Sequence, residues 1–405
     1  MRDAVLVLAL LIVAAKAGGE LMGRLGQPPV LGELLAGVVL GNLGLFGITA
    51  LDPLRDSEML RLVAETGAIL LLFEVGVESD LMQLLAVGWS SLAVATLGVI
   101  APMVLGYFVS AWMVPEASWL THLFVGGTLT ATSVGITARV LKDLGKSNTR
   151  EARIILGAAV VDDVIGLVVL AVVSGLVATA SSVGAGGGAH LGPIVWIIAK
   201  ATVFLTVAVI AGRFWSQRVF IYAARLKVAG ALLALCIAFC FVVAGIAALV
   251  GLAPIVGAFA AGVVLEEVHY KPFVDRGERR VEELLFPITT LTVPIFFVAM
   301  GMRVDLKSFA SASVLGFAAL ITLAAVIGKQ ICGLGVLERG VDRLLIGLGM
   351  IPRGEVGLIF AGLGSSLMVH NGPVLSPRTF SSLVLMIILT TFITPPLLKA
   401  GFDRK

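Results

Sequence analysis

The sequence predicts an all-α, polytopic membrane protein with about 13 transmembrane helices, and three observations support this fold class. Hydrophobic residues make up 59% of the 405 positions and charged residues only 14%, whereas charged residues make up about a quarter of a soluble domain. Apolar runs recur along the chain, and about 20 such residues suffice to cross about 30 Å of hydrocarbon. An internal repeat divides these runs into two similar sets.

Basic residues gather in the loops after the fifth, seventh and ninth spans and at the C-terminus. Because cytoplasmic loops carry an excess of Lys and Arg, we expect the C-terminus in the cytoplasm and the N-terminus outside. The expected spans lie at about 4–24, 28–48, 58–77, 84–113, 119–142, 150–180, 191–215, 228–250, 253–268, 282–302, 308–335, 341–370 and 378–402.

The internal repeat rests on two separate matches. Residues 29–40 (PVLGELLAGVVL) match residues 254–265 (PIVGAFAAGVVL) at an offset of 225 positions, and the same offset relates Gly76 to Gly301. Repeated sequence of this kind predicts repeated structure.

We expect a first six-helix repeat at 1–180, a linker helix at 191–215 and a second six-helix repeat at 228–405. Because the linker crosses the membrane once, the second repeat enters it from the opposite side. Inverted repeats are typical of secondary transporters, whose binding site lies near the midplane where discontinuous helices meet.

The sixth span contains two adjacent carboxylates, Asp162 and Asp163, with apolar neighbours on both sides. Ionisable groups at that depth are costly and by default mark an ion or proton pathway. Adjacent helical residues point about 100° apart, so both can face one cavity with different partners. Burial disfavours a charged carboxylate and a bound cation favours it, so sodium and protons would compete here. A pair with a purely structural role is the alternative.

A lysine, Lys329, lies well inside the apolar eleventh span. An ammonium group at that depth needs a partner, and one of the two aspartates is the obvious choice. The sequence does not decide between Asp162 and Asp163. The alternative is that Lys329 extends its side chain to the membrane surface.

Two further spans contain residues that interrupt a membrane helix. The fifth is rich in glycine and hydroxyl groups, with Thr130, Thr132 and Ser133, and the twelfth contains Pro352 beside two charged residues, Arg353 and Glu355. We expect two crossing discontinuous helices whose exposed ends are compensated by Arg353 and Glu355, with hydroxyl oxygens as ligands. Close packing by small residues is the alternative reading of the hydroxyl cluster.

The residues of these four spans resemble the bacterial monovalent cation/proton antiporter-2 family, most closely its NapA-type electrogenic sodium/proton antiporters, over the whole chain. The motifs are Thr130-Ala-Thr-Ser-Val-Gly-Ile-Thr137, Gly157-Ala-Ala-Val-Val-Asp-Asp-Val-Ile-Gly166, Gly328-Lys329 and Pro352-Arg-Gly-Glu-Val-Gly357. The paired aspartates with the later lysine are the most specific part.

This resemblance implies a homodimer that transports sodium ions and protons in a bacterial inner (cell) membrane. Spans 1–3 and 8–10 would form a dimerising panel, and spans 4–6 and 11–13 a core that moves like an elevator. Asp163 would be the main sodium ligand, with Asp162 and Thr130 beside it, and Lys329 would pair with Asp162 and take part in proton coupling.

Potassium/proton exchange remains open, as does a non-transporting sensor or a cation channel on the same fold. The sequence has no phosphate loop, nucleophile elbow or zinc-ligand spacing, so we expect no enzyme activity and no cofactor. Its basic residues form no patch for nucleic acid, and the expected partners are sodium ions, protons, membrane lipids and a second copy of the chain.

Overall fold

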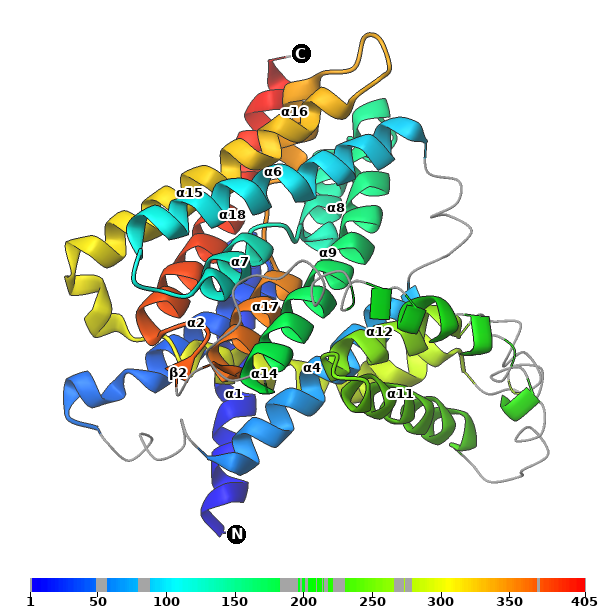
Figure 1. Cartoon of the computed structure of the whole chain (residues 1–405), viewed down its shortest axis with the longest axis vertical. Coiled ribbons are helices and arrows are strands. Elements are labelled where there is room, and N and C mark those ends of the chain that lie inside the picture. The colour runs from blue at the N-terminus through cyan, green and yellow to red at the C-terminus, as the bar shows by residue number, and fades with distance from the viewer. Residues whose placement is uncertain are drawn as a thin grey trace.

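The computed structural model describes residues 2–48, 57–78, 88–182, 230–265, 279–369 and 372–404, together with residue 273 and parts of 196–220. These residues are mostly helical (Figure 1). Within this part of the chain, seven helices are long and apolar enough to cross a membrane, and shorter apolar helices accompany them. The expected total of 13 spans stays a prediction, and most of the expected linker helix lies outside the described residues.

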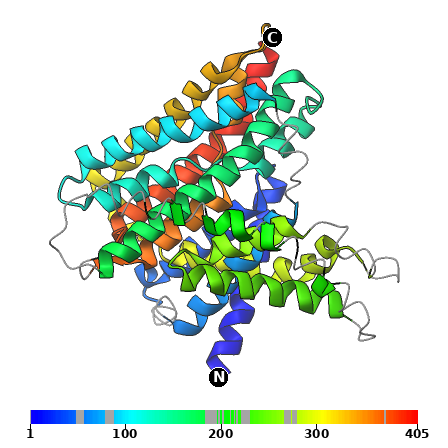
Figure 2. The same ribbon diagram turned by 45° about the vertical axis from the view of Figure 1, so that its right-hand side comes forward.

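Two groups of helices pack mainly among themselves, and they form the lower and upper parts of Figures 1 and 2. The panel group consists of α1 (Arg2–Arg24), α2 (Pro29–Gly41), α4 (Glu58–Glu78), α11 (Ala231–Leu249), α12 (Pro254–Val264) and α14 (Val281–Met302). The core group consists of α6 (Trp89–Met113), α7 (Trp119–Thr128), α8 (Val134–Asp143), α9 (Arg150–Ser182), α15 (Ala312–Ile331), α16 (Arg343–Gly349), α17 (Glu355–Ser366) and α18 (Pro377–Asp403).

Short elements connect these helices. The 3-10 turns are η1 (Leu43–Phe46), η2 (Leu306–Ala310) and η3 (Cys332–Gly335). Strand β1 (Met368–Val369) pairs antiparallel with β2 (Gly372–Pro373). The span expected at 341–370 is therefore not helical to its end, because its last described residues form a strand of this pair.

Local sequence explains where several helices begin. Pro29 and Pro254 are the first residues of α2 and α12, where the missing N–H of proline costs no hydrogen bond. The Ser118 side chain caps α7 by accepting from the Thr121 backbone N–H, and the Ser376 side chain caps α18 in the same way. Such caps satisfy backbone donors that the helix leaves free.

The internal repeat recurs in the packing of the panel group. A Cβ at Gly37 would lie 2.1 Å from the Val298 carbonyl oxygen, and a Cβ at Gly262 would lie 2.3 Å from the Phe73 carbonyl oxygen. The second contact joins positions related to those of the first by the offset of 225, so α12 packs on α4 as α2 packs on α14. Glycine is needed here because the backbones touch. The opposite membrane orientation of the two copies stays a prediction.

Candidate functional site

The side chains of α9 and α15 meet in a fully buried ion pair. Lys329 Nζ lies 3.0 Å from Asp162 Oδ1 and 3.2 Å from Asp162 Oδ2, and both side chains have an exposed fraction of 0%. Of the two aspartates left open by the sequence, the structure therefore pairs Lys329 with Asp162. The attraction between the two charges offsets the cost of removing each of them from water.

Asp163 follows on the next position of α9 and points elsewhere. It is half-buried, and its Oδ1 atom is buried without a hydrogen-bond partner among the described residues. An unpaired carboxylate oxygen in such a place is rare because it has lost its water without replacement. A cation or a proton would satisfy it.

Both expected helix breaks are present, and the two breaks lie against one another. Residues 129–133 separate α7 from α8, and residues 350–354 separate α16 from α17. The Ser133 backbone N–H donates to the Pro352 carbonyl at 2.9 Å. The Thr132 hydroxyl donates to the Met350 carbonyl at 3.4 Å. Each break thus satisfies backbone groups that the other leaves without a helical partner.

Arg353 compensates the C-terminal ends of α7 and α16. One guanidinium nitrogen donates to the Leu129 carbonyl at 2.7 Å and to the Ala325 carbonyl at 3.3 Å. The other donates to the Met350 carbonyl at 3.3 Å and to the Ile351 carbonyl. The side chain is fully buried. A cation at two helix C-termini opposes the negative ends of both helix dipoles.

Glu355 lies at the N-terminal ends of α8 and α17. It is the first residue of α17, and its carboxylate accepts a hydrogen bond from the Ser133 hydroxyl at 3.3 Å. Ser133 in turn caps α8, accepting from the Ile136 N–H at 3.4 Å. Space is tight, because a Cβ at Gly354 would lie 2.7 Å from Ser133 Oγ. A negative group near two helix N-termini is stabilising.

Thr130 lies in the first break, fully buried. Its hydroxyl donates to the Gly127 carbonyl at 2.8 Å, and within the described structure no hydrogen bond joins it to Asp162 or Asp163. Because the hydroxyl is the donor in this bond, the lone pairs of its oxygen could still coordinate a cation. Its expected role as a sodium ligand stays a prediction.

Several residues that shape this site were assigned no role from the sequence. A Cβ at Gly328 would lie 2.7 Å from the Cα of Pro102, and one at Gly98 would lie 3.4 Å from Lys329 Nζ, so two glycines let α6 and α15 approach around the lysine. The Thr391 hydroxyl donates to the Arg353 carbonyl. Glycines in apolar spans are common, and only the run of threonines near Thr391 was a usable signal.

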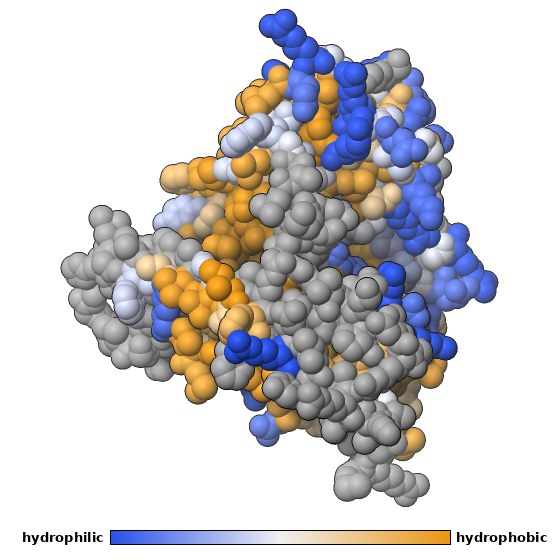
Figure 3. All heavy atoms as spheres, turned by 90° about the vertical axis from the view of Figure 1, so that its right-hand side faces the viewer, coloured by the Kyte–Doolittle hydropathy of each residue, from blue (hydrophilic) through white to orange (hydrophobic). Residues whose placement is uncertain are grey.

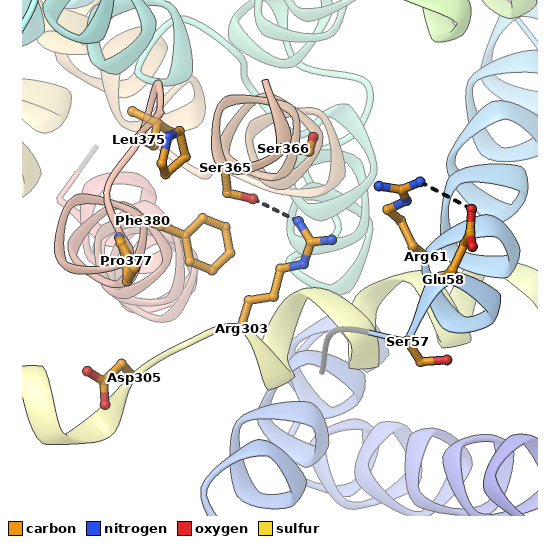
Figure 4. A pocket seen from close by; sticks show the side chains of 11 residues that line it. Ser57, Glu58, Arg61, Arg303, Asp305, Ser365, Ser366, Leu375, Pro377 and Phe380 are labelled. Atoms are coloured by element: carbon orange, nitrogen blue, oxygen red, sulfur yellow. Dashed lines mark hydrogen bonds and ion pairs between the residues drawn. The ribbon is translucent and has the colours of Figure 1, made fainter. Parts of the chain in front are cut away.

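A cavity of about 760 Å³ lies between the panel and core groups (Figure 4). Arg61 of α4 lies on one side of it, and Ser365 at the end of α17 lies on the other. Arg303, which follows α14, extends between them and donates to the Ser365 hydroxyl at 2.9 Å. This hydrogen bond joins the two helix groups directly.

Comparisons with known proteins agree over nearly the whole chain. The family model described as sodium/hydrogen exchanger, transmembrane, matches residues 7–400. The high-affinity Na⁺/H⁺ antiporter NhaS3 of Synechocystis is 36% identical, covering 98% of this chain and 89% of its own length. The Na⁺/H⁺-K⁺ antiporter GerN of Bacillus cereus is also 36% identical, covering 98% of this chain and 96% of its own.

Among solved structures, the sodium proton antiporter MjNhaP1 of Methanocaldococcus jannaschii has a TM-score of 0.71, covering 99% of this chain and 97% of its own. The two sequences are 15% identical, so this likeness concerns the fold alone.

Proposed function

The chain belongs to the sodium/hydrogen exchanger family, as its motifs predicted, and we propose that it is a secondary active transporter that exchanges sodium ions for protons. The observation that carries the proposal is the buried Asp163 oxygen, which has no hydrogen-bond partner among the described residues and lies beside the buried Asp162–Lys329 pair. The relatives are named as antiporters, which supports a transporter rather than an enzyme, and the proposed cycle uses no cofactor.

In the proposed cycle, sodium binds the carboxylates of Asp163 and Asp162, with the Thr130 hydroxyl oxygen as a further ligand. Sodium at Asp162 replaces the Lys329 ammonium as the positive partner, and Lys329 then releases a proton. Asp163 releases a second proton as sodium binds. Two protons would then exchange for one sodium ion, so each cycle carries net charge. A membrane potential contributes about 2.3 kcal/mol per charge per 100 mV and drives such exchange.

Alternating access would come from movement of the core group past the panel group, as in an elevator. The ion site is contained in the core group, since Asp162, Lys329 and both helix breaks belong to its helices. The panel group would form a homodimer with a second copy, in a bacterial inner membrane with the N-terminus outside. Breaking the Arg303–Ser365 hydrogen bond is one step that this movement requires.

Potassium/proton exchange is the second candidate. It is favoured by one observation, the naming of GerN as a Na⁺/H⁺-K⁺ antiporter. Selectivity between these ions depends on the size of the site and the number of its ligands, which the side chains named above leave open.

The test is transport by the purified protein in liposomes that contain a pH-sensitive dye. Sodium, lithium or potassium is added outside, and proton efflux is followed for wild type, Asp163→Asn and the control Asp403→Asn, whose side chain is exposed near the C-terminus. We expect sodium-dependent efflux in wild type and control, and none in Asp163→Asn. Efflux with potassium alone would establish the second candidate, and efflux that survives Asp163→Asn would refute the proposed site.

A further inference from the structure

A second cavity, of about 630 Å³, opens in the core group where α6 and α9 begin. Its lining comes from the start of α6 at Gly88 and Ser91, from α9 between Arg150 and Val160, and from the segment that joins η3 to α16. The starts of both helices lie in the upper part of Figure 1, as does the C-terminus. None of the proposed ion ligands lines this cavity.

The rim of this cavity carries two positive charges that have no partner among the described residues. Arg150 and Arg153 line it, and both side chains are exposed. Neither guanidinium forms an ion pair or hydrogen bond with any residue that the structure describes. Among the described residues that line the cavity, Glu338 is the one with a negative charge. Arginine presents a planar fork of donors that matches a phosphate group, so the rim suits a phosphate ligand.

The rest of the cavity is apolar. Ile154, Leu156, Val160 and Val341 line it below the arginines. Beside it, Trp89 at the start of α6 is 79% exposed. Exposed tryptophans of membrane proteins gather at the level of the lipid headgroups, which places the arginine rim at that level and the apolar lining within the hydrocarbon. Figure 3 shows hydrophilic side chains gathered at the upper end of the molecule and along its right-hand side.

We propose that this cavity binds an anionic phospholipid from the leaflet on the side of the C-terminus. The phosphate would lie between Arg150 and Arg153, and an acyl chain would cover the apolar lining along α9. Basic pockets between membrane helices at this level bind acidic headgroups. The binding site goes beyond the exchange proposed above and does not depend on it.

Purified protein in a neutral detergent tests this by native mass spectrometry and by thermal unfolding. Phosphatidylglycerol is compared with phosphatidylcholine and with inorganic phosphate at the same concentration. The variants are Arg150→Gln/Arg153→Gln, the charge-retaining Arg150→Lys/Arg153→Lys, and the control Lys307→Gln/Arg378→Gln. The control also removes two exposed positive charges, but from the opposite end of the core group.

We expect phosphatidylglycerol to bind wild type and raise its melting temperature, and phosphatidylcholine and inorganic phosphate not to. A basic residue near an anionic headgroup contributes about fivefold in affinity, so the double Gln variant is expected to bind about 30-fold more weakly. The control should bind as wild type does, and the Lys variant should bind between wild type and the double Gln variant, because lysine keeps the charge and loses the planar fork. Equal binding by the double Gln variant, or an equal response to inorganic phosphate, would overturn the lipid assignment. Native mass spectra report binding even where a variant unfolds early.

Discussion

We expect burial, rather than distance, to decide how much an ion pair contributes to the stability of this protein, and two pairs of similar length allow the comparison. Lys329 and Asp162 are 3.0 Å apart with both side chains at 0% exposure. Arg24 and Glu20 are 2.9 Å apart with side chains at 76% and 66% exposure. The prediction concerns what happens when one partner of each pair is replaced by a neutral side chain of similar size.

Replacing Lys329 by Met leaves Asp162 as an uncompensated buried charge, which costs about 3–5 kcal/mol of folding free energy. Replacing both residues, as Asp162→Asn/Lys329→Met, removes both charges together, so no unpaired charge remains buried. The double variant is therefore expected to be more stable than either single variant. Glu20→Gln is expected to cost about 1 kcal/mol or less, because water solvates the arginine that remains.

Thermal unfolding of the five purified proteins in one detergent gives the order of their melting temperatures. We expect wild type, Glu20→Gln and the double variant to unfold close together, and Lys329→Met and Asp162→Asn well below them. If the loss in the double variant equals the sum of the two single losses, the residues do not interact energetically and the assigned pair is wrong. A loss from Glu20→Gln as large as that from Lys329→Met would refute the argument from burial.

Four further predictions follow from the same contacts. Arg353→Met removes a donor from four carbonyls, of which Met350 keeps the Thr132 hydroxyl, at about 1–3 kcal/mol for each buried group left unsatisfied, and an unchanged melting temperature would contradict it. Gly328→Ala inserts a methyl group 2.7 Å from α6 and should cost about 1–3 kcal/mol; Gly316→Ala, with nothing within 4 Å, is its control in the same melting assay. Arg303→Ala removes the hydrogen bond to Ser365, so deuterium exchange at the end of α17 should rise several-fold, and unchanged exchange would show that the bond does not hold the two groups together. If protons and sodium compete for one site, as proposed, the KM for sodium should rise as pH falls while the maximal rate at saturating sodium stays constant; a KM independent of pH would exclude competition at one site.

Much of the fold follows from local signals in the sequence. The apolar runs predicted helices, and the prolines at 29 and 254 begin two of them. Gly, Thr and Pro marked both helix breaks. The antiparallel pair after α17 was missed, because the hydrophobic residues around it resembled the end of a span.

The site was predictable in its members and only partly in its contacts. Opposite charges in apolar surroundings are expected to pair, so the pairing of Lys329 with an aspartate followed from the cost of burial alone. Which aspartate it meets depends on the rotation of α9 against α15, and the residues by themselves do not fix that angle. The sequence also could not predict which carbonyls Arg353 binds, because this depends on where α7 and α16 end in space.

The contacts separate charges that hold the fold from charges that can exchange. Arg353 is bound by carbonyl oxygens and forms no ion pair with a described carboxylate, so an arriving cation has no anionic partner to take from it. Lys329 is bound by a carboxylate, and in the proposed cycle a sodium ion replaces it there. Both groups are cationic and fully buried, yet the proposed cycle uses only the second. The chemistry of the acceptor, and not the charge or depth of the side chain, is therefore what we propose to determine which of the two takes part in exchange.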